Sequence, residues 1–203
     1  MKKTILLSLV IMLSGCSTID SAYTKSTVTG SHIENRTIGF KGFSLKRPSS
    51  YMQFTPSETG LNSTDNAQKA WDLSSRYDRR SGNACERIAF QKGDFGITFA
   101  IVWLDDAFVT KPNKAALRDY LNRLARIATA NGKGGDLNDV IDVGDRVAGR
   151  SGRALSDKAQ YITLHQTLLP PRYMLVVNGA CPLGKEKELL SDIETALSSL
   201  TYE

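Results

Sequence analysis

The sequence predicts an α+β domain with a mainly antiparallel sheet flanked by helices. Segments in which apolar residues alternate with other residues occur in neighbouring pairs joined by short turns, which is typical of β-hairpins. Two further stretches, one in mid-chain and one at the end, carry apolar residues at helical spacing. Strands joined by hairpins, with helices added, indicate an α+β domain because a parallel sheet would need a helical crossover between successive strands.

We expect the folded domain to begin near Ile38. Apolar residues alternate over 38–40 and, in the opposite phase, over 43–45, so Gly42 between them predicts a bulge or a turn. Pro48 should end the second of these strands, because proline cannot donate a ladder hydrogen bond.

Two segments then predict a hairpin around Lys92-Gly93-Asp94: residues 85–91 and residues 95–104. The second segment has no charged residue on either face, which predicts a central strand that is covered on both sides. One face of this strand begins with Gly96, and the small side chains on that face would let a helix approach closely. Residues 112–131 form the amphipathic helix that we expect to cover it.

The remaining elements follow from the same patterns. Residues 67–77 predict a short helix that carries Trp71 inward, and residues 140–148 predict a strand. A hairpin is expected from 159–169 and 173–178, and a closing amphipathic helix from 185–200. The inward face of that last helix should consist of Leu189, Ile193, Ala196, Leu197 and Leu200.

The first residues indicate export. Two lysines precede a short apolar run over residues 5–13, which is too short to span a bilayer and is typical of a secretory leader. The run ends in Leu13-Ser14-Gly15-Cys16, which resembles the lipobox of bacterial lipoproteins. That resemblance implies a signal peptide over 1–15, cleavage before Cys16, and acylation of Cys16 with palmitate-type chains, which would anchor the protein in a membrane.

The leader divides the chain into three parts. Residues 16–37 are rich in Ser and Thr and predict a flexible tether, and residues 38–203 predict a single domain. Ser17 resembles the residue that follows the lipidated cysteine in outer-membrane lipoproteins. This resemblance implies a location in the outer membrane, with the domain facing the periplasm.

Charge and cysteine usage agree with export. The net charge is +5, and loss of Lys2 and Lys3 with the leader leaves 24 basic residues against 21 acidic ones, too small an excess to indicate a nucleic-acid partner. With Cys16 lipidated, Cys85 and Cys181 remain. An even pair in an oxidising compartment predicts a disulfide bond, and the alternative is two buried free thiols.

Two groups of charged residues are candidate sites. Four cations around a Gly/Ser segment could bind an anionic polymer or a lipid headgroup, the alternative being a solvated basic loop; they are Arg146, Arg150, Arg153 and Lys158. Asp105 and Asp106 could serve a cell-wall hydrolase, but adjacent strand residues face opposite sides, which suits acid–base work poorly.

No motif in the sequence predicts a metal site, a cofactor or a catalytic set. His165 is the only histidine of the predicted domain, and no acid or nucleophile is placed beside it by a motif. We therefore expect His165 to be a residue of the sheet surface.

The order of elements resembles a known superfamily. Phe43-Ser44-Leu45-Lys46-Arg47-Pro48 at the start of the domain, the mid-chain helix, the late hairpin and the closing helix over 193–200 resemble the PsbP-like fold. That superfamily includes the extrinsic subunit P of photosystem II and the DcrB-like bacterial lipoproteins. The resemblance implies an α/β/α sandwich and carries over no catalytic residue.

These observations favour a non-enzymatic cell-envelope lipoprotein that binds or braces another envelope component, most simply a protein. One alternative is a periplasmic carrier or sensor of a small ligand, bound in a pocket with aromatic side chains; the candidates are Tyr51, Phe54, Trp71 and Trp103. A cell-wall hydrolase is the other alternative.

Overall fold

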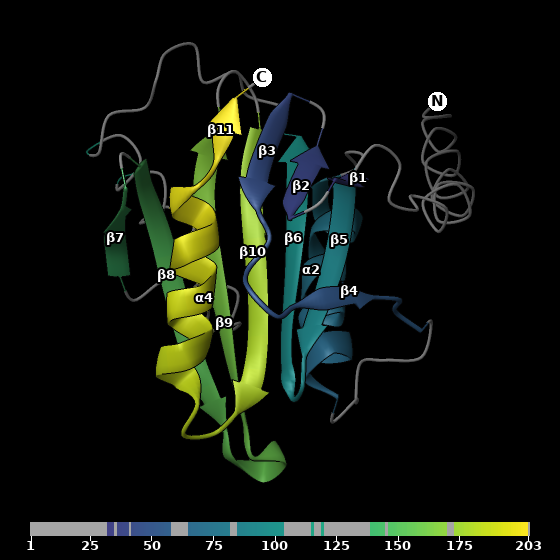
Figure 1. Ribbon diagram of the computed structural model, residues 1–203. Coiled ribbons are helices and arrows are strands. Elements are labelled where there is room, and N and C mark those ends of the chain that lie inside the picture. Colours follow the sequence, from purple (N-terminus) through teal and green to yellow (C-terminus); the bar gives the residue numbers. More distant parts are fainter. Residues whose placement is uncertain are drawn as a thin grey trace, which may run out of the picture.

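The protein is an α+β domain built on a mainly antiparallel sheet flanked by helices, as the sequence predicts (Figure 1). The computed structural model describes residues 32–34, 36–40, 42–57, 65–81, 85–103, 115, 119, 139–144, 146–169 and 173–202. The leader, Cys16, Asp105 and Asp106 lie outside these described residues, as does the tether up to residue 31. Among the described helices, none has the length and apolar character needed to cross a bilayer.

The large sheet has seven antiparallel strands in the order β4-β5-β6-β10-β9-β8-β7. Its strands are β4 (Met52–Phe54), β5 (Cys85–Lys92), β6 (Phe95–Trp103), β7 (Asp139–Val143), β8 (Arg146–Leu155), β9 (Gln160–Leu169) and β10 (Tyr173–Pro182). Both predicted hairpins, β5–β6 and β9–β10, are confirmed. The prediction of a single strand over 140–148 is wrong. These residues belong to the hairpin β7–β8, which turns where Gly144 has a φ of 57°.

A small sheet of four strands, in the order β1-β2-β3-β11, packs over one face of the large one. Its strands are β1 (His32–Glu34), β2 (Thr37–Phe40), β3 (Phe43–Lys46) and β11 (Thr201–Tyr202). The predicted turn at Gly42 is confirmed, with a φ of 79°. The expected start at residue 38 is too late, because β1 pairs with β2 and brings residues 32–34 into the fold.

Of the helices whose bounds the structure describes, two cover the large sheet from opposite sides (Figure 1). Helix α4 (Glu186–Ser198) lies beside the small sheet, and the predicted inward side chains Leu189, Ile193, Ala196, Leu197 and Leu200 are buried. Helix α4 and the small sheet enclose the main core against the large sheet. The largest fully buried side chains of this core include Phe40, Phe90, Phe99, Leu45, Leu175 and Ile97.

Helix α2 (Asn66–Ser81) covers the other face and occupies the position that we assigned to residues 112–131. A Cβ atom on Gly96 would collide with backbone atoms of Asn66 and Ala67. The absence of a side chain at Gly96 thus permits the close approach of a helix, as predicted, but the helix at this position is α2. Of residues 112–131, the structure describes Ala115 and Asp119, both helical, and the remainder lies outside the described residues.

The predicted disulfide bond is not formed, and Cys181 is a buried free thiol. In the sheet register, Cys85 is level with Val102, and Val102 is level with Met174 on β10. Cys181 lies seven residues farther along β10, which is about 23 Å at the usual rise of a strand. A disulfide needs Cα atoms within about 7 Å, so the fold holds the two cysteines at opposite ends of the sheet.

Candidate functional site

A polar pocket of about 380 Å³ opens at the lower end of the large sheet in Figure 1, and we call it the hairpin-end pocket. Four stretches that are far apart in sequence converge there: the start of α2, the β5–β6 turn, the segment from the 3-10 helix η1 (Ser156–Lys158) into β9, and the end of β10. The lining residues are Asp65, Asn66, Gln91, Gly93, Asp94, Lys158, Ala159, Gln160 and Pro182.

Two buried amide side chains hold these stretches together. Asn66 is 8% exposed and Gln160 is 2% exposed. The Nε2 of Gln160 donates to Oδ1 of Asn66 over 2.8 Å, and Nδ2 of Asn66 donates to the backbone carbonyl of Asp94 over 2.6 Å. Because each bond joins two different elements, the network fixes the shape of the pocket before any ligand arrives.

The walls of the pocket are also fixed locally. Asp65 caps α2, since its Oδ1 accepts hydrogen bonds from the backbone N–H groups of Ala67 at 2.7 Å and Gln68 at 3.2 Å. Ala159 has a φ of 49°, a left-handed conformation that is uncommon for a residue with a Cβ atom. Its carbonyl accepts the N–H of Leu183 over 3.0 Å, which ties this turn to the segment after β10.

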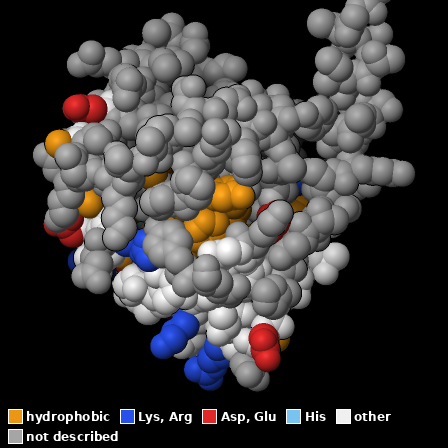
Figure 2. Space-filling view, turned by 90° about the horizontal axis from the view of Figure 1, so that it is seen from above, with side chains coloured by type: hydrophobic (Ala, Val, Ile, Leu, Met, Phe, Trp, Pro, Cys, Tyr) orange, Lys and Arg blue, Asp and Glu red, His pale blue; other side chains and the backbone are white. Residues whose placement is uncertain are grey.

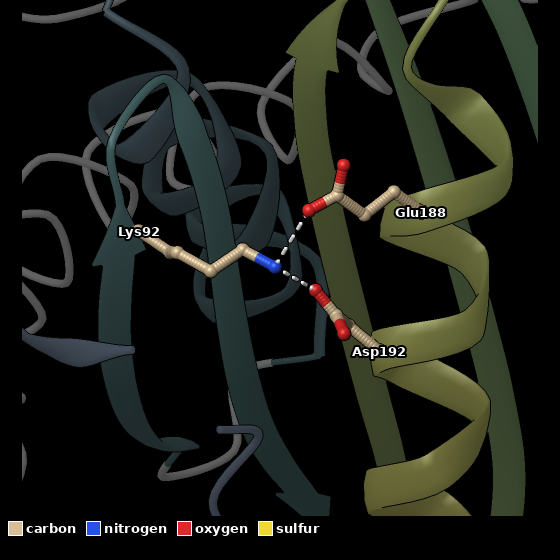
Figure 3. Close-up of polar contacts among 3 residues, drawn as sticks. All are labelled: Lys92, Glu188 and Asp192. Atoms are coloured by element: carbon tan, nitrogen blue, oxygen red, sulfur yellow. Dashed lines mark hydrogen bonds and ion pairs between the residues drawn. The ribbon is translucent and has the colours of Figure 1, made fainter. Parts of the chain in front are cut away.

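A second polar cluster joins the β5–β6 hairpin to α4 (Figure 3). The Nζ of Lys92 lies 3.0 Å from Oε1 of Glu188 and 2.5 Å from Oδ2 of Asp192. It also lies 4.9 Å from the ring centroids of Tyr51 and Phe95. Lys92 therefore bridges two carboxylates that are one helical turn apart while its ammonium packs against aromatic rings.

Three groups in and beside this cluster, Lys92, Tyr51 and Cys181, keep their protons at neutral pH. Burial would lower the pKa of Lys92, but hydrogen bonds to Asp192 and Glu188 outweigh it and raise that pKa. Burial raises the pKa of Tyr51, and Asp192 raises it further. Burial, with Glu186 and Glu188, also raises the pKa of the Cys181 thiol to about 12. Cys181 is therefore not a thiolate at neutral pH, and the contacts of Lys92 tie the β5–β6 hairpin to α4.

His165 is not a surface residue as expected, but is fully buried. It faces the α4 side of the large sheet, where Arg150 is its neighbour on β8 and Val177 its neighbour on β10. Neither ring nitrogen has a hydrogen-bond partner among the described residues. Burial and then the charge of Arg150 lower the pKa of His165 to about 3, so the ring is neutral at physiological pH.

The structure does not gather the four predicted cations into one patch. The Gly/Ser segment lies inside β8, where Arg150 and Arg153 face opposite sides of the sheet. The Nη1 of Arg150 pairs with Oε1 of Glu194 on α4 at 2.9 Å, and Nη2 of Arg146 donates to the carbonyl of Leu200 at 2.8 Å. Lys158 alone of the four lines the hairpin-end pocket.

A second, more open hollow of about 470 Å³ lies between α4 and the β7–β8 hairpin. Its lining residues are Asp142, Val143, Gly144, Arg150, Lys187, Leu190, Ser191, Glu194, Thr195 and Ser198. Tyr51, Phe54 and Trp71 are not among the described lining residues of either hollow, and the side chain of Trp103 lies outside the described part of the chain. Tyr51 packs under Lys92, and half-buried Trp71 packs under the guanidinium of Arg87, 3.9 Å from the ring centroid.

The pocket could not be found from sequence, because no motif spans its four stretches. An isolated Asn or Gln carries no chemical signature in a sequence, so Asn66 and Gln160 could not be recognised as site residues from the sequence. Within the described residues, no group of three or more His, Cys, Asp or Glu side chains is placed to hold a metal ion.

Comparison with known proteins assigns no family. No family profile matches the sequence, and no curated protein matches it. One similar solved structure is a crystal structure of a protein from Bacteroides thetaiotaomicron VPI-5482, which is 13% identical with a TM-score of 0.47. The match covers 87% of this chain and 49% of that protein, so the chain spans about half of that protein's length.

Proposed function

We propose that this protein is a non-enzymatic cell-envelope lipoprotein of the PsbP-like type, whose folded body binds or braces another envelope component. The observation that carries the proposal is the sequence Leu13-Ser14-Gly15-Cys16 after a short apolar run. Lipid on Cys16 would hold the protein at the membrane, in our proposal the outer membrane on its periplasmic side. Two or more acyl chains make such attachment lasting.

The arrangement of the body supports a partner at the end that carries the hairpin-end pocket. Strand β1, the first described element, lies toward the upper end in Figure 1, and the pocket lies at the lower end. Figure 2 looks onto the upper end, where apolar side chains are visible at the centre. A body held through residues that precede β1 would thus present the pocket away from its anchor.

Site-specific photocrosslinking in living cells tests this proposal. A crosslinking amino acid at Asp94 or Lys158, on the rim of the pocket, should give one discrete adduct with an envelope component. The same amino acid at Thr37, an exposed position on β2, is the matched control and should give none. Equal patterns from all three positions would contradict a partner at this end.

The hairpin-end pocket also favours the second candidate function, a carrier or sensor of a small ligand. Its volume lies within the range of small-molecule sites, and its floor is fixed by hydrogen bonds between elements. The lining is polar, so this candidate replaces the aromatic pocket that the sequence suggested. The two candidate functions are compatible if the chemical group that binds in the pocket belongs to the envelope partner.

A further inference from the structure

We propose that the hairpin-end pocket binds a small ligand through a primary ammonium group, the chemistry shared by the amino end of a peptide and an amino sugar. This inference names the ligand class of the second candidate function and rests on that function.

The charges at the rim favour a cationic ligand. Among the described lining residues, two carboxylates, Asp65 and Asp94, outnumber one ammonium, Lys158, so the net charge of this set is negative. Carboxylates form charge-assisted hydrogen bonds with an ammonium group, which has three N–H donors to distribute. Lys158, from a different element, remains to donate to a carboxylate or hydroxyl group of the same ligand.

The floor of the pocket supplies neutral polar contacts. Asn66 and Gln160 are more than nine-tenths buried, and both are among the lining residues. A primary amide has two N–H donors and a carbonyl acceptor, and the bonds to Gln160 and Asp94 use one of the two N–H groups of Asn66. Such groups match the amide of a peptide bond or the hydroxyls of a sugar.

The size and composition of the hairpin-end pocket narrow the class of ligand further. A volume of about 380 Å³ is at the lower end of small-molecule sites, and a dipeptide or a monosaccharide would fill it. Among the described lining residues there is no aromatic side chain and one apolar ring, that of Pro182. The pocket therefore offers little to an acyl chain or an aromatic ligand.

Binding can be measured with two probes, alanyl-alanine and glucosamine. Each is titrated into the purified full-length protein while NMR follows the backbone amides of Gly93, Asp94 and Gln160. We expect shifts at these positions with at least one probe, and its identity separates a peptide end from an amino sugar. The N-acetyl derivative of each probe lacks the ammonium and should bind at least tenfold more weakly.

Variants of the rim test the roles of the two carboxylates. Asp65→Asn keeps a good N-cap acceptor, and Asp94→Asn leaves the backbone carbonyl that accepts from Asn66, so both should fold. Each should weaken binding about tenfold, the effect of losing one charge-assisted hydrogen bond. Asp157→Asn is the control, because Asp157 is exposed on η1 and does not line the pocket.

The inference is overturned if neither amine shifts these amides, or if binding survives N-acetylation or both rim variants unchanged. Such a result would leave lipid attachment at Cys16 untouched, since that is measured on a different residue by acyl labelling. Conversely, a bound amine on a protein without lipid would refute the anchor and keep the pocket.

Discussion

At the scale of single residues, His165 is the least expected feature. Its ring is neutral and buried beside Arg150, and burial there lowers its pKa to about 3, against about 6.5 in an unfolded chain. Below pH 6.5 the imidazole of His165 is therefore protonated in the unfolded state, whereas in the folded state it stays neutral until the pH approaches 3. The stabilising effect of the neutral ring is complete above pH 6.5 and is lost as the pH falls toward 3.

We predict that His165→Leu reduces the acid sensitivity of folding. Between pH 7 and pH 5, His165 should cost the wild-type protein about 2 kcal/mol of unfolding free energy, at about 1.4 kcal/mol per pH unit. Urea unfolding at both pH values measures this loss, which the leucine variant should not show. His32→Gln, which changes the other histidine, is the control and should keep the wild-type slope. Equal slopes in all three proteins would contradict the burial of a neutral ring.

Gly96 supports a second prediction at this scale. Gly96→Ala should lower the unfolding free energy by about 2 kcal/mol or more, because the added methyl group meets the backbone of α2 rather than a side chain that can rotate. Gly152→Ala meets the hydroxyl end of half-buried Tyr161, which can move, so its cost should be smaller. Thermal unfolding of both variants compares them, and the reverse order would argue against this packing of α2.

At the scale of elements, the start of α2 both caps a helix and forms a wall of the pocket. Asp65→Ala should cost about 1 kcal/mol, because two backbone N–H groups lose their acceptor. Asp65→Asn should cost little, since asparagine caps as well as aspartate. Chemical unfolding of the two variants measures the difference. Equal stability of the alanine and asparagine variants would show that the cap contributes nothing.

The tie between the β5–β6 hairpin and α4 gives another prediction. Lys92→Met keeps the aliphatic stem near Tyr51 but leaves Glu188 and Asp192 facing each other without a counter-charge. We expect a loss of about 1 kcal/mol at low salt and less in 1 M NaCl, because the three groups are partly exposed.

A double-mutant cycle separates this electrostatic effect from lost packing. In an Asp192→Asn background, Lys92→Met should cost measurably less than in the wild-type protein. Lys46→Met, at an exposed position on β3, is the matched control and should have no salt-dependent effect. A cost that is the same in both backgrounds would mean that the ammonium does not couple to Asp192.

At the scale of the whole molecule, elements that depend on local sequence patterns could be predicted, whereas contacts between distant segments could not. The hairpins β5–β6 and β9–β10 and the helix α4 could be predicted because alternation and helical spacing are local properties. The choice of α2 over residues 112–131 as the helix against Gly96 depends on packing between distant segments, which periodicity does not encode. For the same reason the number of cysteines could not reveal that Cys85 and Cys181 lie at opposite ends of the sheet.

The pocket and the buried histidine escaped prediction for a related reason. Strand alternation places His165 and Tyr161 on one face correctly, but it does not say what covers that face. Here α4, from the end of the chain, pairs with Arg150 through Glu194 and helps to close that side of the sheet. Likewise, Asn66 and Gln160 become a pocket floor only because α2 and β9 meet at the same sheet end.

Metabolic labelling with radioactive palmitate tests the central claim, the lipid anchor, most directly. The full chain, expressed in a bacterium, should incorporate label and sediment with membranes, whereas Cys16→Ser should incorporate none and lose membrane attachment. Cys181→Ser changes a buried thiol and is the control, which should label as the wild-type protein does. An unlabelled wild-type protein, or a Cys16→Ser variant that labels equally, would contradict the account.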